Sequence, residues 1–479
     1  KLGRQEIKLD GWRLFGNTIW TPGMQTHDAV TFHHQHDNMK VTAGYLKTRE
    51  NSRVGELDDN QDGQVYLVHA NFKGVLGGQF SAIYSYLDEG CSPATANSAG
   101  GTRDCQIGEN NFHTMGGRQA GQMFGLDYRG EYYYQFGRAD GVANNGAAGT
   151  PEVDRSAYMF GVRVGKKFNN VMYKPSVTLW YDYLSGTTDE DQADGDWSSF
   201  NTLFDTGHKF YGLQDVFLGI GNGGVAGTRG LGLQDLAVKF KMNPMPGWTL
   251  KFDAHAFATA EGICANTTTS NVTCKAAGAV AGTADSVDRD AQMFGIRVGK
   301  TFANAKGKPS VTLWFDQLSG HDDDDGAGGD FGQFDTHYDT GHKFYGFQDF
   351  YLSRTGAGTR FFGLQDIALK TKISPRAGWT AKADLHMFST QSGIDGADAD
   401  TVVAADATIG ADNTRNTDLG QELDLTLVHK YDANTKISFG YSHYWTTQTF
   451  GELNANSGAA ANYANQDGSD WFYAQVDTK

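Results

Sequence analysis

Charged side chains recur at every second position along the strand-like stretches of this chain, and they are the residues best placed to act on a solute. In Met159–Phe168, Arg163 and Lys167 alternate with Val162 and Val164. Successive side chains of a strand point to opposite faces, so each stretch has one charged and one apolar face. Neighbouring stretches carry charges of both signs. Two interpretations stay open: cross-strand pairs that stiffen a wall, or a charge-selective constriction of a pore.

The charged faces are predicted to line a water-filled lumen. A charge that faces lipid at mid-bilayer costs about 2–4 kcal/mol, so the apolar faces must be the ones that meet lipid. The predicted pore-lining residues are Arg129, Arg163, Lys167, Asp182, Asp235, Lys239, Lys251, Asp253, Arg297, Asp316, Asp366, Lys370, Lys382 and Asp384.

Two long loops carry the same polar and aromatic motif. Asp205–Gly212 reads DTGHKFYG, and Asp339–Gly346 has the same eight residues. We predict that these loops fold inward and narrow the pore; packing of the loops against the rim is the alternative. The predicted constriction residues are His208, Lys209, His342 and Lys343.

One acidic loop resembles half of a calcium-binding loop. Asp58, Asn60, Asp62 and Gly63 fit the pattern D-x-N-x-D-G, but the twelfth position is His69 where calcium loops carry an acid. An exposed acidic turn is the simpler interpretation. Calcium in the acidic extracellular loops is therefore the one cofactor for which the sequence offers ligands.

The four cysteines form two close pairs. Cys91 and Cys105 bracket one polar loop, and Cys264 and Cys274 bracket another. This spacing predicts two disulfides that staple loops in an oxidising compartment. Neither pair has the CxxC spacing that is typical of zinc sites.

A long segment occurs twice in the chain. Met159–Gly186 and Met293–Gly320 are identical at 20 of 28 positions, and the strand-like stretches that follow each copy also repeat. The predicted internal repeat covers residues 159–261 and 293–391, each as two β-hairpins. Four strands cannot stand alone, so we interpret the repeat as a wall segment within one barrel that covers residues 1–479.

Composition favours an all-β membrane protein. The chain of 479 residues has 62 Gly, 13% aromatic residues and a mean hydropathy of −0.48, with no apolar run of the length of a membrane helix. Short turns alternate with long loops, as in outer-membrane barrels. We predict a transmembrane antiparallel up-and-down β-barrel of about 18 strands, or 22 if strands precede Lys1. The net charge of −16 disfavours a nucleic-acid partner.

Several segments resemble the alginate-export family of outer-membrane porins. The segments that carry the resemblance are KLGRQEIKLD at Lys1–Asp10, RLFG at Arg13–Gly16, HDAV at His27–Val30, FDTGHKFYGLQDVF at Phe204–Phe217, and the GLQD strand starts. The resemblance implies a barrel of about 18 strands that exports or admits a polar solute by diffusion. In the founding member of that family, an arginine-rich constriction attracts a polyuronate. This chain departs from the pattern because its predicted lumen charges have both signs and because it carries the HKFYG unit twice.

These observations predict a porin in the outer membrane of a Gram-negative bacterium, passing polar or charged small solutes or oligosaccharides by passive diffusion. Two other classes stay open: a structural barrel that holds a partner protein or a surface assembly, and an outer-membrane enzyme. The chain shows no nucleophile motif, phosphate loop or catalytic carboxylate pair, so we expect no enzyme. The expected partners are outer-membrane lipid, lipopolysaccharide and the solute, with a monomer favoured.

Overall fold

The structure of the protein is a computed structural model. It describes residues 1–17, 25–49, 63–89, 110–139, 153–188, 191, 196–204, 232–260, 263–264, 286–287, 290–320, 363–394, 416–447, 449–450 and 468–478. Among these residues, no helix is long and apolar enough to cross a membrane.

The described residues fold almost entirely into β-strands. The strands are β1 Leu2–Gln5, β2 His27–His36, β3 Met39–Arg49, β4 Gly63–Val75, β5 Gly78–Glu89, β6 Asn110–Met123, β7 Leu126–Ala139, β8 Val153–Lys167, β9 Ser176–Leu184, β10 Asp196–Trp197, β11 Leu233–Met242, β12 Trp248–Ala258, β13 Ile263–Cys264, β14 Ser286–Val287, β15 Asp290–Thr301, β16 Ser310–Leu318, β17 Leu364–Ile373, β18 Trp379–Ile394, β19 Asn416–Lys430, β20 Thr435–Thr446 and β21 Ser469–Thr478.

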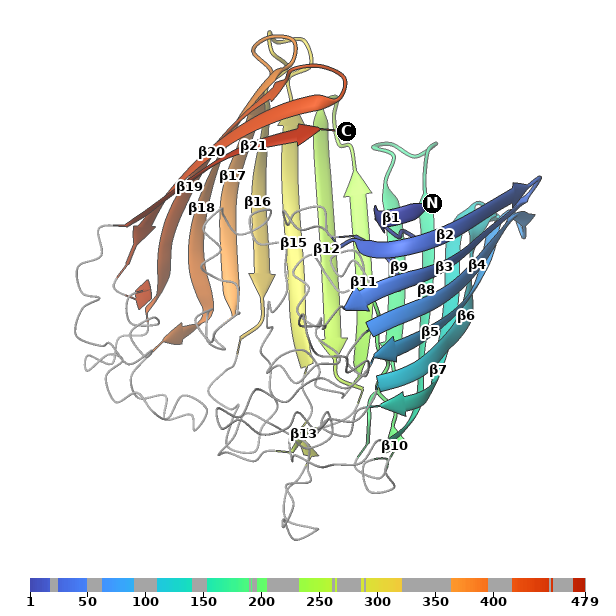
Figure 1. The fold of residues 1–479 in the computed structure, drawn as a ribbon. Coiled ribbons are helices and arrows are strands. Elements are labelled where there is room, and N and C mark those ends of the chain that lie inside the picture. The colour runs from blue at the N-terminus through green and yellow to red at the C-terminus, as the bar shows by residue number, and fades with distance from the viewer. Residues whose placement is uncertain are drawn as a thin grey trace, which may run out of the picture.

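One sheet of 19 strands contains all of them except the short β13–β14 pair. Each of its strands pairs antiparallel with its neighbours in chain order, apart from β10, which pairs parallel with β8. Figure 1 shows the sheet curled into a barrel wall, with β2–β8 and β16–β21 on opposite sides. β1 and β21 are the two end strands, and the registers of the described residues include no pair between them. The prediction of an all-β, antiparallel up-and-down fold of about 18 strands is confirmed.

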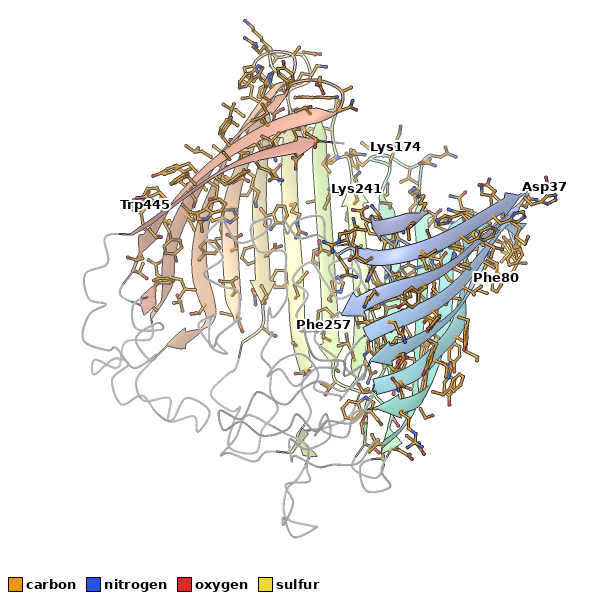
Figure 2. All side chains as sticks on the ribbon, in the orientation of Figure 1. Asp37, Phe80, Lys174, Lys241, Phe257 and Trp445 are labelled. Atoms are coloured by element: carbon orange, nitrogen blue, oxygen red, sulfur yellow. The ribbon has the colours of Figure 1, made fainter. Side chains whose placement is uncertain are left out.

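Short turns lie at one end of the sheet and the long connections at the other (Figure 1). In Figure 2, Asp37 and Lys174 mark the turn end, and Phe257 lies nearer the loop end. Outer-membrane barrels have short periplasmic turns and long extracellular loops, so the turn end corresponds to the periplasmic side.

The turn between β6 and β7 lies at Phe124–Gly125, and β7 runs unbroken through Arg129 and Gly130. The preceding strand, β6, is rich in glycine and therefore reads as a loop. Its glycines are required by close backbone approach, since a Cβ on Gly116 would lie 2.1 Å from the carbonyl oxygen of Tyr132.

The two faces of the sheet divide as the alternation predicts. Apolar side chains of the outer face are well exposed, with Val162 at 48%, Leu179 at 56% and Leu236 at 59%. The alternate positions are buried and largely polar, among them Asp182 and Asp235 at 0%. An exposed apolar face on a sheet of this length is the surface that a barrel presents to lipid.

Two segments form an inner layer on the concave face of β4–β9. The first is the connector, residues 6–17, which follows β1; the second is the loop segment, residues 196–204. They join through a parallel bridge between Phe15 and Phe204, and the Gly16 amide donates to the Phe204 carbonyl at 2.7 Å. Ile7, Leu14 and Phe15 of the connector are buried. The connector therefore folds inward, against the wall.

Candidate functional site: a charged path on the inner face

Arg13 of the connector binds two carboxylates of the barrel wall. Its guanidinium donates to Glu131 on β7 at 2.9 Å and to Asp182 on β9 at 2.6 Å. The Arg13 side chain is 2% exposed and the two carboxylates are 1% and 0% exposed. Charge-assisted hydrogen bonds in a desolvated place are strong, and breaking them leaves a buried charge. Arg13 therefore fixes the connector against the inner wall.

A second contact holds the start of the connector. Asp10 lies 3.0 Å from Nε2 of His69 on β4. Burial opposes ionisation of Asp10, but the hydrogen bond and charge of His69, a hydrogen bond from Ser81 and the charge of Arg118 outweigh it and lower the Asp10 pKa. The ionised carboxylate therefore favours the docked connector.

Next to Arg13, cations gather around Trp180 of β9. The guanidinium of Arg163 lies over the indole ring, and Nζ of Lys239 lies 4.6 Å from the ring centroid. The indole N–H donates to Asp182. Cations over a tryptophan face are attracted by its quadrupole, so the ring and the carboxylate hold this group together. We call Arg163, Trp180, Asp182 and Lys239 the first station.

The second copy of the repeat builds a second station from Arg297, Trp314, Asp316 and Lys370. Arg297 lies 4.1 Å and Lys370 4.7 Å from the Trp314 ring centroid, and the Trp314 indole N–H donates to Asp316. In this copy the carboxylates are bound by the arginine of the wall, not by an arginine of the connector. The Arg297 guanidinium binds Asp253 and, at 2.8 Å, Asp316.

Toward the loop end, each copy also places an Asp–His pair on the inner face. Nδ1 of His255 lies 2.9 Å from Asp235, and Nδ1 of His386 lies 2.8 Å from Asp366. All four side chains are at most 1% exposed. Each imidazole also stacks on a phenylalanine two residues further along its strand. The carboxylate thus fixes the orientation of each buried ring.

The predicted pore-lining residues all lie on the strand positions of this face. Lys167, Lys251 and Lys382 are exposed near the turn end, while the Asp and Arg members lie deeper in the wall. Their role in lining a pore stays a prediction.

Sequence reasoning missed several residues of this face. The missed residues are Arg13, Arg118, Glu131, Glu422 and Asp424. The alternation of side chains within Thr417–Tyr431 predicts that Glu422 and Asp424 point inward, because they follow the same period of two. Arg13 follows no strand period, and only the fold brings it to the wall.

Some predictions fall on residues that the structure leaves undescribed. The predicted constriction residues His208, Lys209, His342 and Lys343 and the calcium candidates Asp58, Asn60 and Asp62 lie outside the described residues. So do Cys91, Cys105 and Cys274; Cys264 ends β13. The described residues give the predicted disulfides no support, and they contain no group of three or more His, Cys, Asp or Glu side chains arranged to hold a metal.

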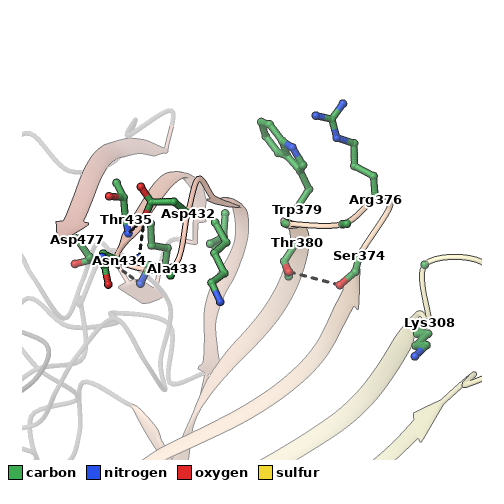
Figure 3. A pocket seen from close by; sticks show the side chains of 16 residues that line it. Lys308, Ser374, Arg376, Trp379, Thr380, Asp432, Ala433, Asn434, Thr435 and Asp477 are labelled. Atoms are coloured by element: carbon green, nitrogen blue, oxygen red, sulfur yellow. Dashed lines mark hydrogen bonds and ion pairs between the residues drawn. The ribbon is translucent and has the colours of Figure 1, made fainter. Parts of the chain in front are cut away.

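A hollow opens at the turn end, between the β15–β16, β17–β18 and β19–β20 turns (Figure 3). It encloses about 820 Å³ and includes Lys308, Arg376, Lys430 and Asp432 in its lining. The backbone amides of Asn434 and Thr435 donate to Asp432 and lower its pKa. Cations therefore outnumber the ionised acids at this mouth of the inner face.

An antiparallel meander with an apolar outer face and a charged inner face defines an outer-membrane β-barrel. The family model for alginate export matches residues 1–222 and 271–466, and the chain belongs to that family. The protein is thus an outer-membrane barrel of the Gram-negative type.

Three solved structures similar to this chain differ from it strongly in sequence. The siderophore receptor PiuA of Acinetobacter baumannii is 12% identical (TM-score 0.39, 88% of this chain and 62% of that chain). The copper transporter OprC is 10% identical (TM-score 0.43, 95% and 64%). OccK2 of Pseudomonas aeruginosa is 8% identical (TM-score 0.34, 96% and 94%). The chain thus spans less than two thirds of PiuA and of OprC. A search of curated proteins finds no match.

Proposed function

We propose that the protein is a passive outer-membrane channel for polar or charged small solutes or oligosaccharides. The observation that carries the proposal is the pair of stations on the inner face, each a tryptophan with an arginine, a lysine and an aspartate. Aromatic and charged groups that line one path offer a polar solute contacts without a deep, closed site. Conduction needs contacts that are favourable enough for entry and weak enough for exit.

The distribution of charge along the inner face supports a path for anionic groups. Exposed lysines on adjacent strands face each other near the turn end, with Lys241 opposite Lys251 and Lys372 opposite Lys382. Like charges directly opposite each other destabilise a sheet, so their presence in both copies of the repeat favours a functional role. The cationic lining of the turn-end hollow extends this path.

Deeper in the wall, the stations and the Asp–His pairs carry both signs of charge. A wall of mixed sign does not select strictly for anions. We therefore propose a broad preference for polar solutes, with acidic sugars passing faster than neutral sugars of the same size.

The remaining expectations belong to the same proposal. The channel works as a monomer among lipid and lipopolysaccharide, without an enzymatic step. The two cysteine pairs staple extracellular loops, and the loops that carry His208 and His342 narrow the mouth.

The test is reconstitution of the full chain in planar bilayers and in liposomes. We expect an open conductance with modest ion selectivity, and faster liposome swelling in uronate oligomers than in neutral oligosaccharides of equal length. Lys251→Gln combined with Lys382→Gln is expected to reduce that difference, while Lys166→Gln, an exposed lysine on the outer face of β8, serves as the control. A barrel that neither conducts nor allows swelling contradicts the channel and favours the structural barrel.

A further inference from the structure

Each copy of the repeat contains a space that a guanidinium group fills. The space lies above a glycine of the wall, Gly161 on β8 and its counterpart Gly295 on β15. A Cβ on Gly161 would lie 2.4 Å from Oδ1 of Asp182 and 3.3 Å from a terminal nitrogen of Arg13. A Cβ on Gly295 would lie close to Asp316 and 2.8 Å from a terminal nitrogen of Arg297. We call this space the guanidinium slot.

The walls of the two slots correspond. The acids are Glu131 and Asp182 in the first copy and Asp253 and Asp316 in the second, on the strand before and the strand after the glycine. Two carboxylates that converge over a glycine match the fork of an arginine side chain.

The occupants of the two slots differ in origin. Arg297, two residues after Gly295 on the same strand, fills its own slot. Arg163 holds the same place relative to Gly161, but its guanidinium lies over the Trp180 ring and 3.7 Å from Asp182. Arg13, at 2.6 Å from Asp182, fills the first slot instead. The second copy therefore shows where a wall arginine goes when the connector does not supply one.

We propose that Arg13 and Arg163 are alternative occupants of one guanidinium slot, and that this exchange makes the connector a releasable gate of the channel. When the connector leaves, Arg163 shifts into the slot and takes the position that Arg297 holds in the second copy, where the guanidinium binds both acids and still lies 4.1 Å from the Trp314 ring centroid. The inference rests on the proposed channel function.

The exchange explains how a buried ion pair can release its partner. Removing one member of a buried ion pair leaves the other charge desolvated and is strongly destabilising. Glu131 also has the guanidinium of Arg129 at 3.9 Å. With Arg163 in reserve, undocking of Arg13 leaves Asp182 with a guanidinium partner too. Trp180 and Lys239 keep their places, since Lys370 lies at nearly the same distance from Trp314 in the second copy.

The test compares Arg13→Ala, Arg163→Ala and the double variant of the full chain. We expect each single variant to lower the Tm only slightly, because the other arginine fills the slot, and the double variant to lower it by clearly more than the sum. Arg13→Ala is also expected to raise the conductance severalfold, while Arg163→Ala, which keeps the connector docked, is expected to give no such rise. Arg4→Ala, whose guanidinium is exposed, is the matched control for loss of an arginine.

Two results would overturn the inference: additive Tm losses in the three variants, or an Arg13→Ala channel that conducts like the parent. Absence of conductance in the parent protein rejects the channel function instead. In that case the Tm cycle still decides whether the two arginines exchange.

Discussion

The two copies of the repeat build the same station, but a different arginine binds the two buried acids in each. In the second copy, Arg297 of the wall binds both Asp253 and Asp316, without a contribution from the connector. In the first copy, Arg13 arrives from the connector and takes the equivalent acids, while Arg163 lies over Trp180. The same arrangement of acids around a glycine can therefore stabilise the wall alone in one copy and bind the connector in the other. What changes is the source of one guanidinium.

The largest expected effect is the loss of Arg297. Arg297→Ala leaves Asp253 and Asp316 buried without their main partner, at a cost of about 3–5 kcal/mol in the free energy of unfolding. Arg163→Ala is expected to cost far less, because Arg13 already holds the first pair of acids. Denaturant unfolding followed by tryptophan fluorescence measures both. Equal losses of unfolding free energy in the two variants would mean that the two arginines have the same role in the two copies.

The glycines beneath the slots come next. A Cβ on either one meets a carboxylate oxygen at 2.4 Å or less, so Gly161→Ala and Gly295→Ala are each expected to cost about 1–3 kcal/mol. Only Gly161→Ala also disturbs the connector, through Arg13, and only it is expected to change conductance. Gly130→Ala is the control, since no atom lies within 4 Å of its Cβ position. A conductance change in Gly295→Ala would argue against the separate roles.

The Asp–His pairs are the part of the inner face that is the same in both copies. His255→Phe and His386→Phe each deprive a buried aspartate of its hydrogen bond and are expected to cost about 1–3 kcal/mol. Because the distances and the burial match, the two losses should be equal within error. Thermal unfolding of the two variants side by side gives the comparison. A clear inequality means that the surroundings of the two pairs differ in a way that their direct contacts do not reveal.

The smallest expected effect is that of acidic pH on the conductance. The Asp10 pKa is lowered in the docked connector, so protonation of Asp10 weakens docking as the pH falls through that depressed value, below the ordinary range near 4. The groups that face Asp10 are His69, Ser81 and Arg118. Conductance is expected to rise modestly in this acidic window, and Asp10→Asn is expected to show the raised conductance already at neutral pH. A response of Asp10→Asn identical to that of the parent at every pH would assign the acid effect to other groups.

Much of the fold could be predicted from the sequence, because a strand in a membrane barrel must show its lipid face in a period of two. The repeat, the turn ends and the inner positions such as Asp182 and Lys239 follow from that rule. The β6–β7 hairpin could not be predicted, because glycines that allow close backbone approach look like loop residues. The role of Arg13 could not be predicted either, because no local pattern connects the connector with β7 and β9.

The position of Arg13 in the chain also bears on how the barrel is assembled. Its partners Glu131 and Asp182 follow it by 118 and 169 residues. Contacts between residues so far apart in sequence close large loops and form late in folding. The connector can therefore dock only after β7, β8 and β9 have paired. The barrel is expected to pass through an assembly stage in which the wall is complete on that side and the interior is still clear.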